Sequence, residues 1–174
     1  MPRMTQGLLL LAGLLAGAAA AQEPGQDPGS RPTREFVQSA AQSDTFEMME
    51  AYTALTGSKD PQVRAYAQMM LRDHGQTSAN LTAAAARAGL KPPPMALGTD
   101  QAQMLNALQS KGPAEFDQTY WKQQALSHRS ALVVQQRYAT TGDTPALRQA
   151  ATAAVPIIEQ HLQTAERMAA TTPG

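Results

Sequence analysis

The stretch that decides the fold is residues 145–168, PALRQAATAAVPIIEQHLQTAERM. Apolar or small residues recur there at alternating intervals of four and three, which is the period of one face of an α-helix. The series runs through Leu147, Ala151, Ala154, Ile158, His161, Ala165 and Met168. This pattern predicts a long helix with one buried face, and it places a histidine on that face.

The composition extends this prediction to the whole chain. The 174 residues include 33 Ala and 19 Gln, but only 5 Val, 2 Ile and 8 aromatic residues. Ala, Gln, Leu and Met favour helices, whereas sheets need the β-branched and aromatic residues that are scarce here. The absence of Cys excludes disulfides and cysteine zinc sites. With 14 basic and 14 acidic residues the net charge is zero, which argues against a nucleic-acid partner.

The beginning of the chain is typical of a targeting segment. Residues 1–21 combine Arg3, a short apolar run at residues 8–15 and the small-residue sequence Ala19-Ala20-Ala21. This is the pattern of a signal peptide, and the apolar run is too short for a membrane-spanning helix. We therefore expect an exported protein, in the periplasm or associated with the outer membrane, with no transmembrane span after cleavage. Peripheral attachment to the envelope stays open.

Helix-breaking and capping residues divide the remainder. Residues 22–32 are rich in Pro and Gly and are predicted to form a flexible linker. Gly57, Asp60-Pro61, Gly112-Pro113 and Gly142 to Pro145 mark helix ends and starts. The predicted helices cover residues 33–55, 61–88, 100–109, 113–140 and 145–168. Two antiparallel hairpins joined by a long crossover with a short helix are the plan of a ferritin-like four-helix bundle, expected over residues 33–170 with a tail at 171–174.

Polar residues interrupt the apolar faces at similar heights. The three histidines, His74, His128 and His161, fall on or beside apolar stripes, and Glu47 follows helical spacing on the first long helix. Counted from the hairpin ends at 1.5 Å per residue, each pair within a hairpin lies within about one turn of the same height. This alignment suggests a metal site made of Glu47, His74, His128 and His161.

The ligand chemistry of such a site favours a transition metal. Imidazole with carboxylate suits zinc, copper or iron. Met70 would add a soft ligand for copper, and Asp73 and Asp117 are candidates to orient an imidazole. The alternative interpretation is a structural network of hydrogen-bonded buried groups without any metal.

Five stretches carry a resemblance to a known family: Phe36 to Ala41, Met70 to His74, Phe116 to Tyr120, His128, and Pro156 to Leu162. In order and spacing they resemble the bacterial domain of unknown function 4142. The resemblance implies a ferritin-like fold in secreted or periplasmic proteins, often described as putative outer membrane proteins. It implies no reaction.

The sequence offers little support for an enzyme. It contains no HExxH motif, phosphate-binding glycine loop or Ser-His-Asp arrangement. A ferritin-like di-iron site needs a carboxylate three residues before its histidine, and those positions hold Leu71 and Ile158. The leading hypothesis is a non-enzymatic protein with an envelope or stress-related role. The alternative is a transition-metal-binding protein, redox-active or not, built on the His/Glu cluster.

Overall fold

The computed structural model describes residues 29–173, and over this range the chain forms five helices and no strand. The helices are α1 (Arg31–Gly57), α2 (Pro61–Arg87), α3 (Thr99–Gln109), α4 (Pro113–Thr141) and α5 (Pro145–Thr171). The expected signal peptide and residues 22–28 of the expected linker lie outside the described residues. The all-helical prediction is confirmed.

The helix starts follow from local side-chain chemistry. Each long helix has a proline in its first turn, where the missing N–H costs no hydrogen bond. Asp60 caps α2 by accepting from the backbone N–H groups of Gln62 and Val63. Ser30 caps α1 by accepting from Thr33 N at 3.1 Å, so α1 begins at Arg31 rather than at the expected residue 33. The linker expected to reach residue 32 is shorter by that amount.

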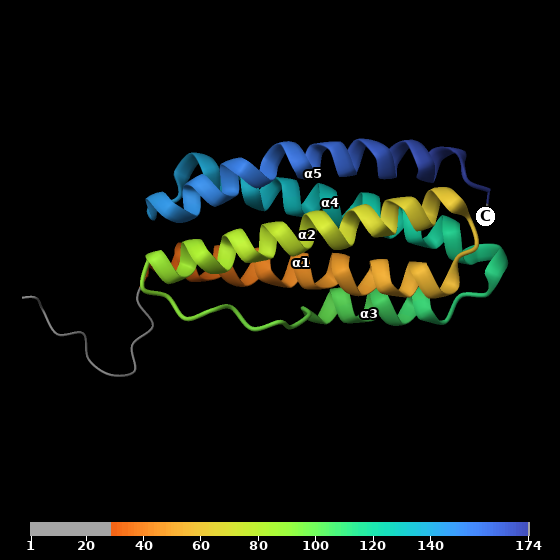
Figure 1. The fold of residues 1–174 in the computed structure, drawn as a ribbon, viewed down its shortest axis with the longest axis horizontal. Helices are drawn as coiled ribbons and strands as arrows, with labels where there is room; N and C mark the ends of the chain where they lie inside the picture. The colour runs from red at the N-terminus through yellow and green to blue at the C-terminus, as the bar shows by residue number, and fades with distance from the viewer. Residues whose placement is uncertain (1–28, 174) are drawn as a thin grey trace, which may run out of the picture.

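The four long helices pack as two hairpins lying side by side (Figure 1). The pair α1–α2 and the pair α4–α5 make the most extensive contacts, and the hairpins meet along α1–α4 and α2–α5. The crossover carries α3 along the outside of the bundle, where it contacts α1 and α4. All four long helices therefore contribute to one shared interior.

That interior is divided along its length. One apolar cluster at the Gly57 end includes Val63, Tyr66, Met70 and Trp121. A second cluster at the opposite end includes Phe36, Leu81, Tyr138 and Leu147. Between them lies a set of buried polar side chains from α1, α2, α4 and α5, which we call the polar layer: Asp44, Glu47, Glu50, His74, Gln124, His128 and His161.

The apolar face predicted within residues 145–168 is buried from Leu147 to Ala165. On α4, the apolar residue Leu126 was counted with the inward positions of the helix, but the structure leaves it 52% exposed. The inward face of α4 instead follows Gln124, His128 and Ala131. Leu126 stands two residues from both Gln124 and His128, which places it on roughly the opposite side of the helix. No helix in residues 29–173 has a stretch long and apolar enough to cross a membrane.

A polar junction ties the start of α1 to the α4–α5 turn. The buried Thr33 hydroxyl contacts the Tyr138 hydroxyl at 2.6 Å and donates to the Asp143 carboxylate. The Tyr138 ring stacks on Phe36 with centroids 3.9 Å apart. The hydroxyls of Ser30 and Thr33 lower the pKa of Asp143 to about 2, since both hydrogen-bond to the charged form. The junction therefore stabilises the fold while Asp143 is ionised.

We expect Asp143→Asn to destabilise the protein at neutral pH and to have little effect near pH 2. The carboxyl is more acidic in the folded state, so its contribution is fully present above the unfolded pKa of about 3.8 and is lost as the pH falls through about 2. Urea denaturation of both proteins between pH 2 and pH 7 measures this difference. Asp100→Asn, which alters an exposed carboxyl outside the junction, is the control. A difference independent of pH would contradict the assignment.

Candidate metal centre

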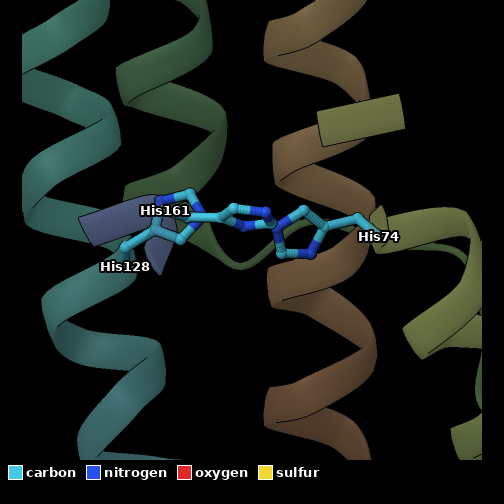
Figure 2. Close-up of side chains that lie close together, drawn as sticks. All are labelled: His74, His128 and His161. Carbon is cyan, nitrogen blue, oxygen red and sulfur yellow. The ribbon is translucent and has the colours of Figure 1, made fainter. Parts of the chain in front are cut away.

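Three histidines from three helices meet in the middle of the bundle. His74 lies on α2, His128 on α4 and His161 on α5, and their rings point toward one another across the interior (Figure 2). Ring centroids are 5.2–5.4 Å apart for all three pairs. One ring nitrogen from each histidine can be chosen so that all three lie within 4.8 Å of one another. Each side chain is at most 2% exposed.

Each ring uses one nitrogen to contact an oxygen atom. His74 Nδ1 lies 2.9 Å from Asp44 Oδ1, which also accepts from the Thr77 hydroxyl. His128 Nδ1 donates to the backbone carbonyl of Gln124 at 2.8 Å. His161 Nε2 lies 3.0 Å from Asp73 Oδ2. These contacts fix the ring orientations, as do the oxygen partners of histidines in known metal sites.

The remaining nitrogens of His74 and His128 face each other. Their Nε2 atoms are 3.3 Å apart. Because a carbonyl oxygen can only accept, His128 Nδ1 carries a proton, and in the neutral ring its Nε2 bears a lone pair. Two facing lone pairs repel, so this contact requires a cation or one shared proton. Without a metal, the hydrogen-bonded set of Asp44, His74 and His128 therefore holds one proton more than it would with two neutral rings and an ionised Asp44.

The third ring has a nitrogen with no described partner. His161 Nδ1 is buried and, within residues 29–173, forms no hydrogen bond. The nearby Tyr66 hydroxyl donates to the His161 backbone carbonyl at 3.2 Å rather than to the ring. A buried lone pair without a donor is uncommon in folded proteins and needs a ligand, water or ion to account for it.

Burial keeps the imidazoles of His74 and His161 uncharged. Desolvation lowers the pKa of His74 to about 4, and desolvation together with the other two histidines lowers the pKa of His161 to about 4. Burial also raises the pKa of Asp44 to about 7, against the opposing hydrogen bond from Thr77. At neutral pH, His74 and His161 are therefore neutral, which is the state that binds metal ions.

Glu47 lies beside the histidines but belongs to a neighbouring network. Its Oε1 is 3.6 Å from His128 Nδ1, the ring nitrogen that faces away from His74. Its carboxyl accepts from Gln124 Nε2 at 2.6 Å and from the Ser127 hydroxyl. Gln124 Nε2 also donates to Glu50 at 2.9 Å. Burial, together with the charge of Glu47, raises the pKa of Glu50 well above its usual value.

The other residues expected at the site lie in different surroundings. Asp73 contacts His161 directly. Met70 is fully buried in the apolar cluster with Tyr66 and Trp121. Asp117 precedes His128 by eleven residues on the same helix, about 16 Å along its axis, so it does not orient an imidazole of this cluster.

Sequence reasoning missed two residues that hold the rings and the carboxyls. Asp44 precedes Glu47 by three residues, and Gln124 precedes His128 by four, so both share a helix face with a residue that was identified. This spacing was a usable signal. Neither Asp44 nor Gln124 was among the residues predicted for the site.

We expect Gln124→Leu to destabilise the protein by about 2–4 kcal/mol, because Glu47 and Glu50 both lose a buried donor. Glu50→Gln should cost less, since burial and the neighbouring Glu47 already disfavour the charged form of this carboxyl and raise its pKa. Urea denaturation of the metal-free proteins at pH 7 gives both values. Equal losses for the two variants would mean that the polar layer does not depend on the Gln124 amide.

Comparison with solved structures identifies the fold class. A DUF305 fragment from Deinococcus radiodurans superposes with a TM-score of 0.70 at 16% identity, covering 82% of this chain and 98% of that one. CopM in the Cu(I)-bound form gives 0.69 at 17% identity with the same coverage. CopM in the Cu(II)-bound form gives 0.66 at 15%, covering 79% and 95%. At this identity the likeness shows a shared helical fold.

The sequence itself is assigned at the level of a family. No curated protein matches the chain. The model of the family described as "Domain of unknown function (DUF4142)" matches residues 18–168, and this span contains all three histidines. The resemblance seen in the sequence motifs is thereby confirmed, and the chain belongs to the DUF4142 family.

Proposed function

We propose that this protein binds one transition-metal ion, copper or zinc, through His74 Nε2, His128 Nε2 and His161 Nδ1. The observation that carries the proposal is the directed arrangement of the three rings: each has one nitrogen held by an oxygen atom and the other left for a ligand. Three imidazoles suit copper, zinc, iron and nickel better than magnesium or calcium. Sequence reasoning treated this function as the alternative, and the geometry makes it the preferred one.

The spacing of the free nitrogens supports the proposal. Two nitrogens bound at 2.0–2.1 Å to a tetrahedral zinc ion are separated by about 3.3–3.4 Å. The Nε2 atoms of His74 and His128 are 3.3 Å apart. A cation between them would also replace the shared proton and remove the repulsion between their lone pairs. One ring nitrogen of His161 lies within 4.8 Å of a ring nitrogen on each of the other two histidines.

Three ligands leave one position of a tetrahedral ion open, which is typical of sites that exchange ligands or undergo redox chemistry. Copper is the first metal to test, because CopM, a protein of similar fold, is described in copper-bound forms. Oxidase chemistry of the di-iron type is not proposed, since Leu71 and Ile158 occupy the positions that would need carboxylates. We propose the ferritin-like arrangement of the bundle and an exported, envelope-associated location on the sequence features given above.

The binding test uses the chain's own fluorescence. Trp121 is the one tryptophan of the sequence, and its ring centroid lies 4.8 Å from that of Tyr66, which is 6.5 Å from His128. Cu(II) added to the metal-free chain should quench this fluorescence with an endpoint of one equivalent, and elemental analysis should find the same stoichiometry. His128→Gln and His161→Gln should each abolish the tight phase, while the surface variant Glu159→Gln should bind as the wild type does. If folded wild-type protein retains no copper or zinc, the cluster is a structural polar network.

The oxygen partners provide a second test. Asp73→Asn and Asp44→Asn leave all three imidazoles in place but weaken the contacts that orient His161 and His74. We expect each to reduce copper affinity by roughly 10–100-fold, as for other residues that orient metal ligands. Competition with a chelator of known affinity measures the change. Unaltered affinity in both variants would mean that the rings are positioned by packing alone.

A further inference from the structure

A small cavity in the interior leads from solvent to the polar layer. Its volume is about 40 Å³, enough for three or four water molecules at about 10–15 Å³ each. Residues from α1, α2, α4 and α5 line it. Asn80 and Ala153 on its lining are exposed, whereas Asp44 at the other extreme is buried. The cavity therefore extends from the surface to the carboxyl that contacts His74.

The lining of this cavity combines small side chains with oxygen acceptors. On α5 it is lined by three alanines, Ala150, Ala153 and Ala154, together with Ile157. Facing them are Asp44 and Gln135. Gln135 is 91% buried by area, and its Oε1 atom has no hydrogen-bond partner among the described residues. A buried amide oxygen of this kind requires a water molecule or a cation as its partner.

We infer that this cavity is the route by which the metal ion enters and leaves the histidine cluster, with Gln135 and Asp44 as successive oxygen ligands along it. The inference rests on the proposed function, because it concerns access to the same site. The amide oxygen of Gln135 offers a neutral ligand that replaces part of the hydration of the ion. Asp44 lies at the inner end of the route, where its carboxyl is 2.9 Å from Nδ1 of His74, the ring whose Nε2 is the proposed metal ligand.

Blocking an entry route changes the rates of binding and release, whereas altering a binding site changes the affinity. Narrowing a passage raises the barrier for entrance and exit equally, so both rates fall while the ratio that defines the dissociation constant is preserved. Ala153→Leu places a branched side chain at the outer opening, on an exposed helix position that accepts Leu readily. Gln135→Leu removes the amide oxygen while keeping a similar volume.

The experiment measures Cu(II) exchange in the full chain by stopped flow. Quenching of Trp121 after mixing with Cu(II) gives the association rate, and recovery with excess chelator gives the dissociation rate. We expect Ala153→Leu to slow both rates by about tenfold with an unchanged dissociation constant, a barrier increase of about 1.4 kcal/mol. Gln135→Leu should slow both as well. Ala170→Leu, at an exposed position of α5 outside the cavity, should match the wild type.

The possible results separate this inference from the proposed function. If the wild type binds one equivalent of copper but both cavity variants exchange it at the wild-type rate, the route is wrong and the binding site stands. If Ala153→Leu changes the dissociation constant and one rate only, the residue acts on the site rather than on a passage, and the route is again wrong. If the wild type shows no saturable quenching, both the proposed function and the route fail. Unchanged far-UV circular dichroism and melting temperature verify that each variant is folded.

Discussion

The structure depends on how a bundle of amphipathic helices accommodates seven polar side chains in the middle of its core. Burying a polar or charged group without a partner costs several kcal/mol, so such a layer persists only if its members satisfy one another. Here the partners come from different helices: Asp44 of α1 meets His74 of α2, Glu47 of α1 meets Gln124 of α4, and His161 of α5 meets Asp73 of α2. A shift of one hairpin against the other by one helical turn would separate the second and third of these pairs, which join the two hairpins. The layer thus specifies the register of one hairpin against the other. The two apolar clusters would specify it poorly, because many of their residues are alanines that can replace one another.

The same polar layer also brings the groups that could bind a ligand together in one place. Most of its polar atoms have partners within the described chain, and the exceptions are informative. Within the layer these are His161 Nδ1 in the histidine cluster, and Glu50 Oε1 and Gln124 Oε1 in the neighbouring carboxyl network. Gln135 Oε1, outside the layer, also has no partner and lines the cavity that reaches Asp44. A network built only for stability would gain from closing these gaps, since a half-satisfied polar network is less stable than an apolar core. The unpartnered His161 nitrogen is one reason for proposing a binding site rather than a purely structural network in this interior.

Much of the fold could be predicted because the sequence marks its elements clearly. Prolines and capping residues such as Asp60-Pro61 set the helix starts, and the period of Leu147 to Ala165 set the buried face of α5. The meeting of the three histidines followed from counting heights along each hairpin. The hydrogen-bond partners of the rings could not be predicted in the same way. A helical period shows which residues share a face but not how each helix is rotated about its own axis. An error of about 100° moves Leu126 outside and Gln124 inside, and the same limit concealed Asp44. The prediction for Asp117 failed for a different reason, because this residue lies about 16 Å along the α4 axis from His128.

The position of the polar layer also bears on the order in which the molecule assembles. Each hairpin is built from contacts between neighbouring segments of the chain, which form early in helical proteins. The histidine cluster instead joins α2 to α4 and α5, across 54 residues between His74 and His128. Its side chains can lose their water only when the hairpins dock, after much of the apolar surface at either end has already collapsed. The centre of the core is therefore expected to be the last part to dry, and a metal ion present during folding would meet the three imidazoles while they are still open to solvent.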